Sequence, residues 1–315
     1  MKISDFNIKK MDPALHDWAY SRRFQTPKGF SAFEEIVKFH LGNMYAMSNP
    51  RYAKHVNDNE DVSLSSNYAC TNVFFSTAGP VYWVSSSLLE AAMRTTLPAS
   101  LRMEDVPLPA PSGIYMLPKG QLKMDGSNLD HILFGWPEKN KEYRPICRDT
   151  KYPYSVTTKK GLLWTTYSPE TDCMYGGKGY GEGLVSDAFD KFPQHIEENY
   201  AEFGVPNDGG VVSIPTLLIK LMLLTAEPGL LSEGTVIRRV KAGKKKKINL
   251  WSPNWVGYKY NHKRELKTGQ GNTHASPRLH WRRGHYRMQP HGPLTERKVK
   301  TIWIAPVLIG AENER

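Results

Sequence analysis

Residues 211–226 read Val211-Val-Ser-Ile-Pro-Thr-Leu-Leu-Ile-Lys-Leu-Met-Leu-Leu-Thr-Ala226, and this stretch decides the fold. On a helix, its apolar side chains would fall on nearly every face, and a helix that is hydrophobic all round belongs inside a core. The run is interrupted by Pro215 and Lys220 and is too short to cross a bilayer. It therefore predicts the central, buried helix of a soluble protein.

Upstream of this helix, the sequence predicts helices first and strands later. Apolar residues recur at helical spacing in residues 15–24 and 33–47, and residues 81–97 begin apolar and end where a proline would stop a helix. Glycines across residues 175–183 predict a loop, and residues 184–203 a polar helix. Short apolar runs bounded by turn residues are typical of strands. They lie at residues 113–117, 131–136, 154–157, 161–167 and 248–251.

These patterns predict an α+β fold with a helical N-terminal region, a central buried helix, and antiparallel strands that include a C-terminal hairpin. We expect a helical region at residues 1–105, an α+β core at 106–230, and a basic β module at 231–315 that could be continuous with the core. Three widely spaced cysteines and an N-terminus without an apolar signal predict a cytoplasmic protein with no membrane partner.

Positive charge is concentrated near the C-terminus. Residues 235–300 contain 18 lysines and arginines against two acids, a balance of +16. Subtracting this from the +11 of the whole chain leaves −5 for the other 249 residues. A basic face on a neutral-to-acidic body is typical of proteins that bind polyanions, although a solubilising surface is the alternative. The densest run is expected to bind phosphates and consists of Lys244, Lys245, Lys246 and Lys247.

The most informative stretch is Pro277-Arg-Leu-His-Trp-Arg-Arg-Gly-His-Tyr-Arg287, in a region that holds half of the ten histidines. On a regular strand, His280 and His285 would lie on opposite faces, because they are five residues apart. A β-bulge at Gly284 would bring both histidines to one face. We therefore expect a bulge, or a closely approaching phosphate, at this glycine.

Three kinds of site are open to these side chains. His280 and His285 could cleave RNA without a metal, one as general base and the other as general acid. The basic residues could instead bind RNA or a peptide carboxylate without chemistry, or only stabilise the hairpin. Arginine holds phosphate with paired hydrogen bonds, so phosphate binding is expected of Arg278, Arg282, Arg283 and Arg287. No cofactor or metal is expected, because arginines repel a cation and no acid or cysteine is close in sequence.

A second strand, at residues 298–310, follows the turn Pro290-His-Gly-Pro293 and completes the predicted hairpin. Trp303 is flanked by isoleucines and is expected in the core. Together with Pro277, Gly284 and Pro306, it is interpreted as a structural residue of the motif.

Residues 277–287, followed by Ile302-Trp-Ile-Ala-Pro-Val-Leu-Ile-Gly310, resemble the C-terminal end of a family encoded by phages and plasmids. These are relatives of the type V-A anti-CRISPR protein that blocks biosynthesis of the CRISPR effector nuclease. Residues 108–116 and 217–228 resemble two further segments of that family in the same order, so the resemblance spans roughly residues 80–310. The shared motif positions are Pro277, His280, Arg282, Arg283, Gly284 and His285, whereas Arg287 stands where the family has a histidine.

The resemblance implies an anti-defence protein of a mobile element, acting in the cytoplasm of a bacterial host. By this resemblance, the protein would recognise a nascent peptide and trigger destruction of the message being translated. The expected partner is therefore RNA or a ribosome, with a nascent peptide of a host defence protein as a further candidate. Two alternatives stay open, a metal-independent, toxin-like ribonuclease and a non-catalytic nucleic-acid-binding regulator, and whether the protein is an enzyme stays open with them.

Overall fold

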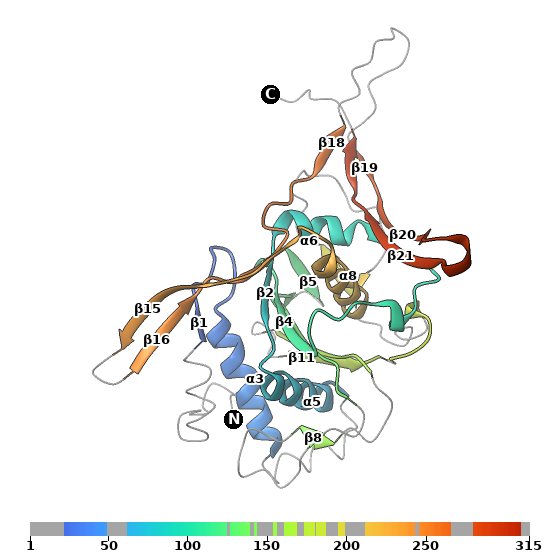
Figure 1. Ribbon diagram of the computed structural model, residues 1–315. Coiled ribbons are helices and arrows are strands. Elements are labelled where there is room, and N and C mark those ends of the chain that lie inside the picture. Colours follow the sequence, from blue (N-terminus) through green and yellow to red (C-terminus); the bar gives the residue numbers. More distant parts are fainter. Residues whose placement is uncertain are drawn as a thin grey trace.

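A mixed sheet of seven strands forms the centre of the molecule, with the order β11-β10-β7-β4-β2-β17-β14 (Figure 1). β2 is parallel to both neighbours, β4 and β17, and the other neighbouring strands are antiparallel. The strands are β2 (Val81–Val84), β4 (Ser112–Met116), β7 (His131–Gly135), β10 (Leu163–Ser168), β11 (Cys173–Lys178), β14 (Leu231–Ser232) and β17 (Asn254–Val256). The computed structural model describes residues 22–48, 62–124, 127–138, 142–143, 154–155, 161–168, 173–179, 181–186, 195–198, 212–242, 246–265 and 280–309.

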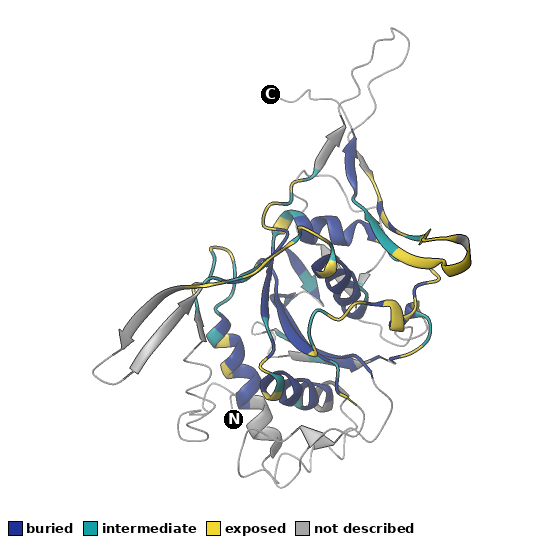
Figure 2. Ribbon diagram, viewed as in Figure 1, coloured by how far each residue is buried: buried dark blue, intermediate teal, exposed yellow. Residues whose placement is uncertain are grey.

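Alternate side chains of the central sheet enter two separate cores, because successive residues of a strand point to opposite faces. In β2, Val81 and Trp83 belong to the core beside α3 (Phe33–Ser48) and α5 (Val62–Thr77), whereas Tyr82 and Val84 belong to the other. That second core is covered by α6 (Ser86–Met93) and α8 (Ile214–Ala226), and Figure 2 shows both helices largely buried. The sheet is therefore a middle layer between helices.

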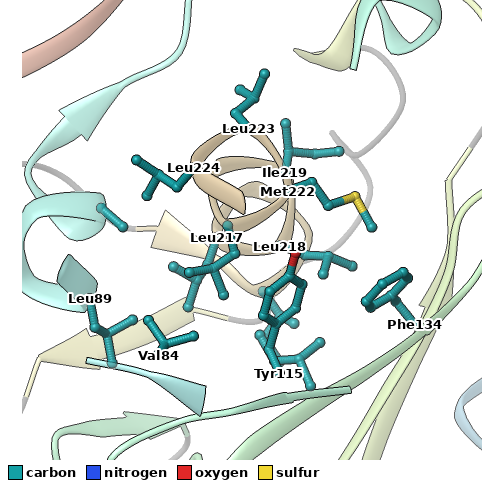
Figure 3. Close-up of a cluster of buried hydrophobic side chains, with 14 of the residues drawn as sticks. Val84, Leu89, Tyr115, Phe134, Leu217, Leu218, Ile219, Met222, Leu223 and Leu224 are labelled. Carbon is teal, nitrogen blue, oxygen red and sulfur yellow. The ribbon is translucent and has the colours of Figure 1, made fainter. Parts of the chain in front are cut away.

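The central helix predicted from residues 211–226 is confirmed as α8. The Ser213 side chain caps its first turn by accepting a hydrogen bond from the Thr216 amide, and a proline occupies that turn, where no helical donor is lost. Every residue from Leu217 to Leu224 is buried. Figure 3 shows Leu217 and Leu218 directed towards Tyr115 of β4. The all-round apolar pattern thus corresponds to a helix enclosed by the sheet and α6.

The remaining strands form smaller sheets around this centre. Three of them make an arm, namely β1 (Arg22–Phe24), β15 (Val236–Ala242) and β16 (Lys246–Trp251). A second group lines the α8 side and consists of β5 (Leu122–Met124), β6 (Ser127–Asn128), β12 (His195–Glu198) and β13 (Val212–Ser213). The C-terminal group consists of β3 (Thr95–Thr96), β18 (Lys263–Glu265), β19 (His280–Arg282), β20 (Gly284–His291), β21 (Lys298–Ile304) and β22 (Val307–Ile309). A short pair, β8 (Glu142–Tyr143) and β9 (Tyr154–Ser155), and two 3₁₀ turns, Met103–Asp105 and Leu294–Glu296, complete the described elements.

The α+β fold class and the C-terminal hairpin are confirmed, while several local expectations are wrong. Residues 22–24 of the expected first helix form a strand, because they pair in parallel with β16. Residues 81–84 form a buried strand, and the helix after it ends at Met93, before the short strand β3. The predicted loop at residues 175–183 begins as part of β11, and residues 195–198 of a predicted helix pair with β5. No described helix combines the length and apolar character needed to cross a membrane.

Candidate functional site

The C-terminal hairpin keeps one register through two ladders. β20 pairs with β21 from His285 opposite Ile304 to His291 opposite Lys298, and β19 pairs with β22, where Arg282 faces Val307. Between these two paired regions, each strand contributes the same number of residues, namely two, so the register does not shift. The predicted bulge at Gly284 is therefore wrong, because a bulge needs an extra residue on one side.

This register inserts no extra residue between His280 and His285, so the bulge that was expected to bring them to one face is absent. Their proposed catalytic pairing loses the feature that was expected to bring them together. Both residues remain predictions as far as catalysis is concerned.

Gly284 is required for another reason, the close approach of the hairpin to the end of α6. Its amide donates to the carbonyl oxygen of Arg94 at 3.0 Å, and it pairs in parallel with Thr95. A Cβ at this position would lie 2.6 Å from the Thr95 hydroxyl oxygen and 2.7 Å from Cδ of Pro306. A glycine is thus needed where the hairpin crosses the body of the protein.

One face of the β20–β21 hairpin is exposed and basic. Along β20, Gly284 and Tyr286 are buried, whereas the alternate residues His285 and Arg287, and Arg283 just before the strand, are exposed. Cross-strand partners share a face, so Lys300, opposite Gln289, and Lys298, opposite His291, extend the same surface. Figure 2 shows the outer part of the hairpin as exposed. We call this surface the hairpin face; its basic and histidine residues are Arg283, His285, Arg287, His291, Lys298 and Lys300.

Neither strand of the hairpin contains aspartate or glutamate, and Glu227, which follows α8, lies close enough to Lys300 for their charges to interact. Nη2 of Arg287 donates to Oε1 of Gln289 at 2.6 Å, so the guanidinium extends along the strand towards Lys300. Both residues of that pair belong to the same face. The arrangement suits an elongated anion better than a single small one.

The opposite side of the hairpin is anchored in the core. The Tyr286 hydroxyl donates to the carbonyl oxygen of Lys220 in α8 at 3.5 Å, and burial raises the pKa of Tyr286 well above its usual value. Trp303, opposite Tyr286, is partly buried against the α8-side core, and its Nε1 donates to Oγ1 of Thr95 at 3.3 Å. The basic face therefore lies on a supported strand pair and not on a free loop.

A buried charge cluster underlies the hairpin, and sequence reasoning missed it. Glu90 Oε1 lies 3.1 Å from Nη2 of Arg94, and Glu90 Oε2 accepts from Nε2 of His262 at 3.1 Å. The side chains of Glu90, Arg94 and His262 are only 0%, 3% and 2% exposed. Burial and the charge of Glu90 raise the pKa of nearby Tyr260 to about 12. In the sequence, only the four-residue spacing of Glu90 and Arg94 on a helix could have indicated this cluster.

A second buried polar cluster lies on the α3 side of the sheet. Nε2 of His40 and Nε2 of His131 are 2.9 Å apart, and the Asn67 amide donates to Nδ1 of His40 at 2.8 Å. Because His40 Nδ1 accepts, its Nε2 carries the proton and donates to His131. Burial, followed by the neighbouring His131, holds the pKa of His40 well below its usual value, and burial lowers that of His131 to about 3. Both rings are therefore neutral at pH 7 and support the fold.

Other predicted residues are placed only in part. Lys246 and Lys247 begin β16, and His280 begins β19. Lys244, Lys245, Pro277 and Arg278 lie outside the described residues. Within the described part of the chain, no three histidine, cysteine, aspartate or glutamate side chains are grouped so that they could hold a metal ion.

Comparison with known families places the sequence in one of them. The AcrVA2-like model, which represents the anti-CRISPR type V subtype A2 family, matches residues 82–311. This match covers well over half of the chain and confirms the resemblance, and the protein belongs to that family. No individual curated protein is significantly similar to it.

Proposed function

We propose that this member of an anti-CRISPR family lowers the expression of a host defence target by acting on RNA or on the translating ribosome, and that the hairpin face is its contact with phosphate. Family membership supports an anti-defence role. The observation that carries the RNA contact is the exposed surface of Arg283, Arg287, Lys298 and Lys300, which lies on a strand pair without acids. Glu227 is the acid whose charge reaches this surface, at Lys300.

The chemistry of this surface fits a nucleic-acid backbone. Arginine presents a planar fork of donors that matches two phosphate oxygens, and lysine adds a mobile point charge. Successive cationic positions on one strand face are two residues apart along the chain, about 7 Å, which is close to the spacing of phosphates on an extended strand. Each phosphate neutralised releases counterions, so affinity should fall steeply with salt.

Binding is better supported than cleavage. Of the two candidate histidines, His285 is exposed on the hairpin face, and the register has no bulge that would bring His280 to it. A general acid and a general base must both reach the reacting phosphate. We therefore assign the basic residues to binding, and degradation of a message would then require a nuclease of the host.

The experiment compares three tagged proteins expressed in a bacterial host: the wild type, the double variant Arg287→Ala/Lys300→Ala, and the control Lys38→Ala. Lys38 is an exposed lysine of α3, away from the hairpin. After purification at low salt, co-purifying RNA is quantified and sequenced. We expect the double variant to lose most of the RNA and the control to keep it. Equal RNA recovery with all three proteins would reject the hairpin face as the contact.

A further inference from the structure

Three aromatic side chains form a second candidate surface on the α3 side of the central sheet. The rings of Trp255 and Tyr258 are 5.3 Å apart at 47°, and those of Phe30 and Trp255 are 5.6 Å apart at 85°. Tyr258 is 64% exposed, which is unusual for a large ring, whereas Phe30 and Trp255 are half-buried. We call these three residues the aromatic platform.

The backbone holds the aromatic platform in place. Trp255 lies beside Trp83 in the parallel register of β17 and β2, and both pack on the α3-side core. The turn that presents Tyr258 begins at Gly257, whose φ of +78° favours glycine and whose Cβ would lie 2.5 Å from Leu88. The Gly257 amide donates to Leu230 at 2.8 Å, and the Ser85 hydroxyl donates to the Gly257 carbonyl oxygen at 2.7 Å. Tyr258 is thus exposed on a fixed turn.

The platform lies where the basic arm joins the body. β1 carries two basic residues, β15 three and β16 two, and none of these strands contains an acid. β16 ends at Trp251, just before β17 and Trp255, and β1 ends shortly before Phe30. Figure 1 shows β15 and β16 extending away from the central sheet. A strand of nucleic acid following the arm would therefore arrive at the platform.

Nearby charges also favour an anion. Lys28 and Lys259 are exposed neighbours of the platform in the chain, and exposed Lys119 joins them because its amide donates to Gly29 at 2.7 Å. The nearby acids are Glu34 and Glu35 in the first turn of α3. Glu233 acts on the other side of the sheet, where burial and then its charge raise the pKa of Tyr82 to about 12. A cationic ligand is disfavoured beside three lysines.

We infer that Phe30, Trp255 and Tyr258 are a base-stacking platform for single-stranded RNA whose phosphates follow the basic arm. Aromatic rings bind unpaired bases of any sequence through their π-faces, and basic grooves bind the backbone. Bases within a duplex are already stacked, so the platform selects single strands. The choice of RNA as ligand rests on the proposed function, but the surface is separate from the hairpin face.

The test measures binding of a fluorescent 12-nucleotide oligouridine and of an abasic strand with the same sugar and phosphate groups. We expect the wild type to bind the oligouridine about tenfold more tightly than the abasic strand, the gain typical of one stacked base. Tyr258→Ala should remove this preference, and Tyr258→Phe should keep it. Equal affinity of the wild type for both strands would overturn the platform while leaving the hairpin contact intact.

The hairpin variant separates the two proposals. Arg287→Ala/Lys300→Ala should weaken binding of both strands by the same factor and leave the oligouridine preference unchanged. If that variant binds normally while Tyr258→Ala loses the preference, the platform stands and the hairpin contact falls. A Tyr258→Phe variant that behaves like Tyr258→Ala, or tighter binding of the matching oligodeoxythymidine, would overturn the assignment to RNA stacking.

Discussion

The buried charge cluster and the hairpin face use the same residue types on two sides of one backbone junction. Arg94 and His262 are enclosed with Glu90, whereas Arg287 and His285 are exposed on strands without acids. The hydrogen bond from Gly284 to the Arg94 carbonyl joins the two regions. Because the buried charge cluster is enclosed, its opposite charges stabilise the fold. Because the hairpin face is exposed, its charges can bind a ligand. Changes on the two sides should therefore have different consequences.

The largest effect is expected from Glu90→Ala. Removing one partner of a buried ion pair leaves an uncompensated charge and costs about 3–5 kcal/mol of unfolding free energy. The change leaves Arg94 without the carboxylate that lies 3.1 Å from Nη2 of its side chain. Urea unfolding followed by circular dichroism measures the loss. Glu104→Ala is the control, because its ion pair with Arg102 and the hydrogen bond it accepts from the Gly183 amide are both exposed, so its removal should shift the unfolding midpoint far less.

A comparable loss is expected from Leu221→Ala in α8. Leu221 is fully buried between the sheet and α6, and truncation of a buried leucine costs about 2–5 kcal/mol through lost burial and the cavity that remains. The same urea titration measures it. Leu231→Ala in the edge strand β14 is the matched control, since Leu231 is 36% exposed. An unfolding midpoint shifted equally by both changes would contradict the central position of α8.

The contrast also explains what the sequence could predict. The α8 helix and the hairpin are encoded by continuous local patterns, an all-round apolar run and two strand segments joined by a turn that contains prolines and a glycine. Helix α5 has no such pattern, because buried Asn67, Thr71 and Asn72 interrupt its apolar residues. Strands β1 and β12 exist through pairing with distant strands, which local propensity does not encode.

Buried clusters were missed for the same reason. Glu90 and His262 are 172 residues apart, and His40 and His131 are 91 apart, so only the fold brings them together. Arg283, His285 and Arg287 of the hairpin face were singled out from the sequence because they lie close together in one segment, whereas His291, Lys298 and Lys300 were not. A bulge was expected to switch the alternation at Gly284, but the structure has none. The contact that does require this glycine was not predictable, since Thr95 belongs to a distant segment.

A pH-dependent loss of stability is expected from the two buried histidines, His40 and His131. The pKa values of His40 and His131 are lowered in the folded state, so the unfolded state binds more protons as the pH falls below about 6.5. Stability is therefore fully present above that pH and is lost as the pH falls towards 3. Between pH 7 and pH 5, each neutral buried histidine should account for about 1–2 kcal/mol of lost unfolding free energy. His40→Gln should flatten this pH dependence in urea titrations at several pH values.

The smallest effect concerns one charge on the hairpin face. Arg287→Ala should leave the unfolding free energy unchanged, because the side chain is exposed. If Arg287 neutralises one phosphate, the slope of log affinity against log salt should become shallower by about 0.7 for single-stranded RNA. Fluorescence anisotropy between about 50 and 200 mM salt measures that slope. Gln289→Ala is the matched control, because it removes the partner that accepts from Arg287 at 2.6 Å without removing a charge. An unchanged slope in Arg287→Ala, or an equal change in both variants, would show that Arg287 makes no phosphate contact.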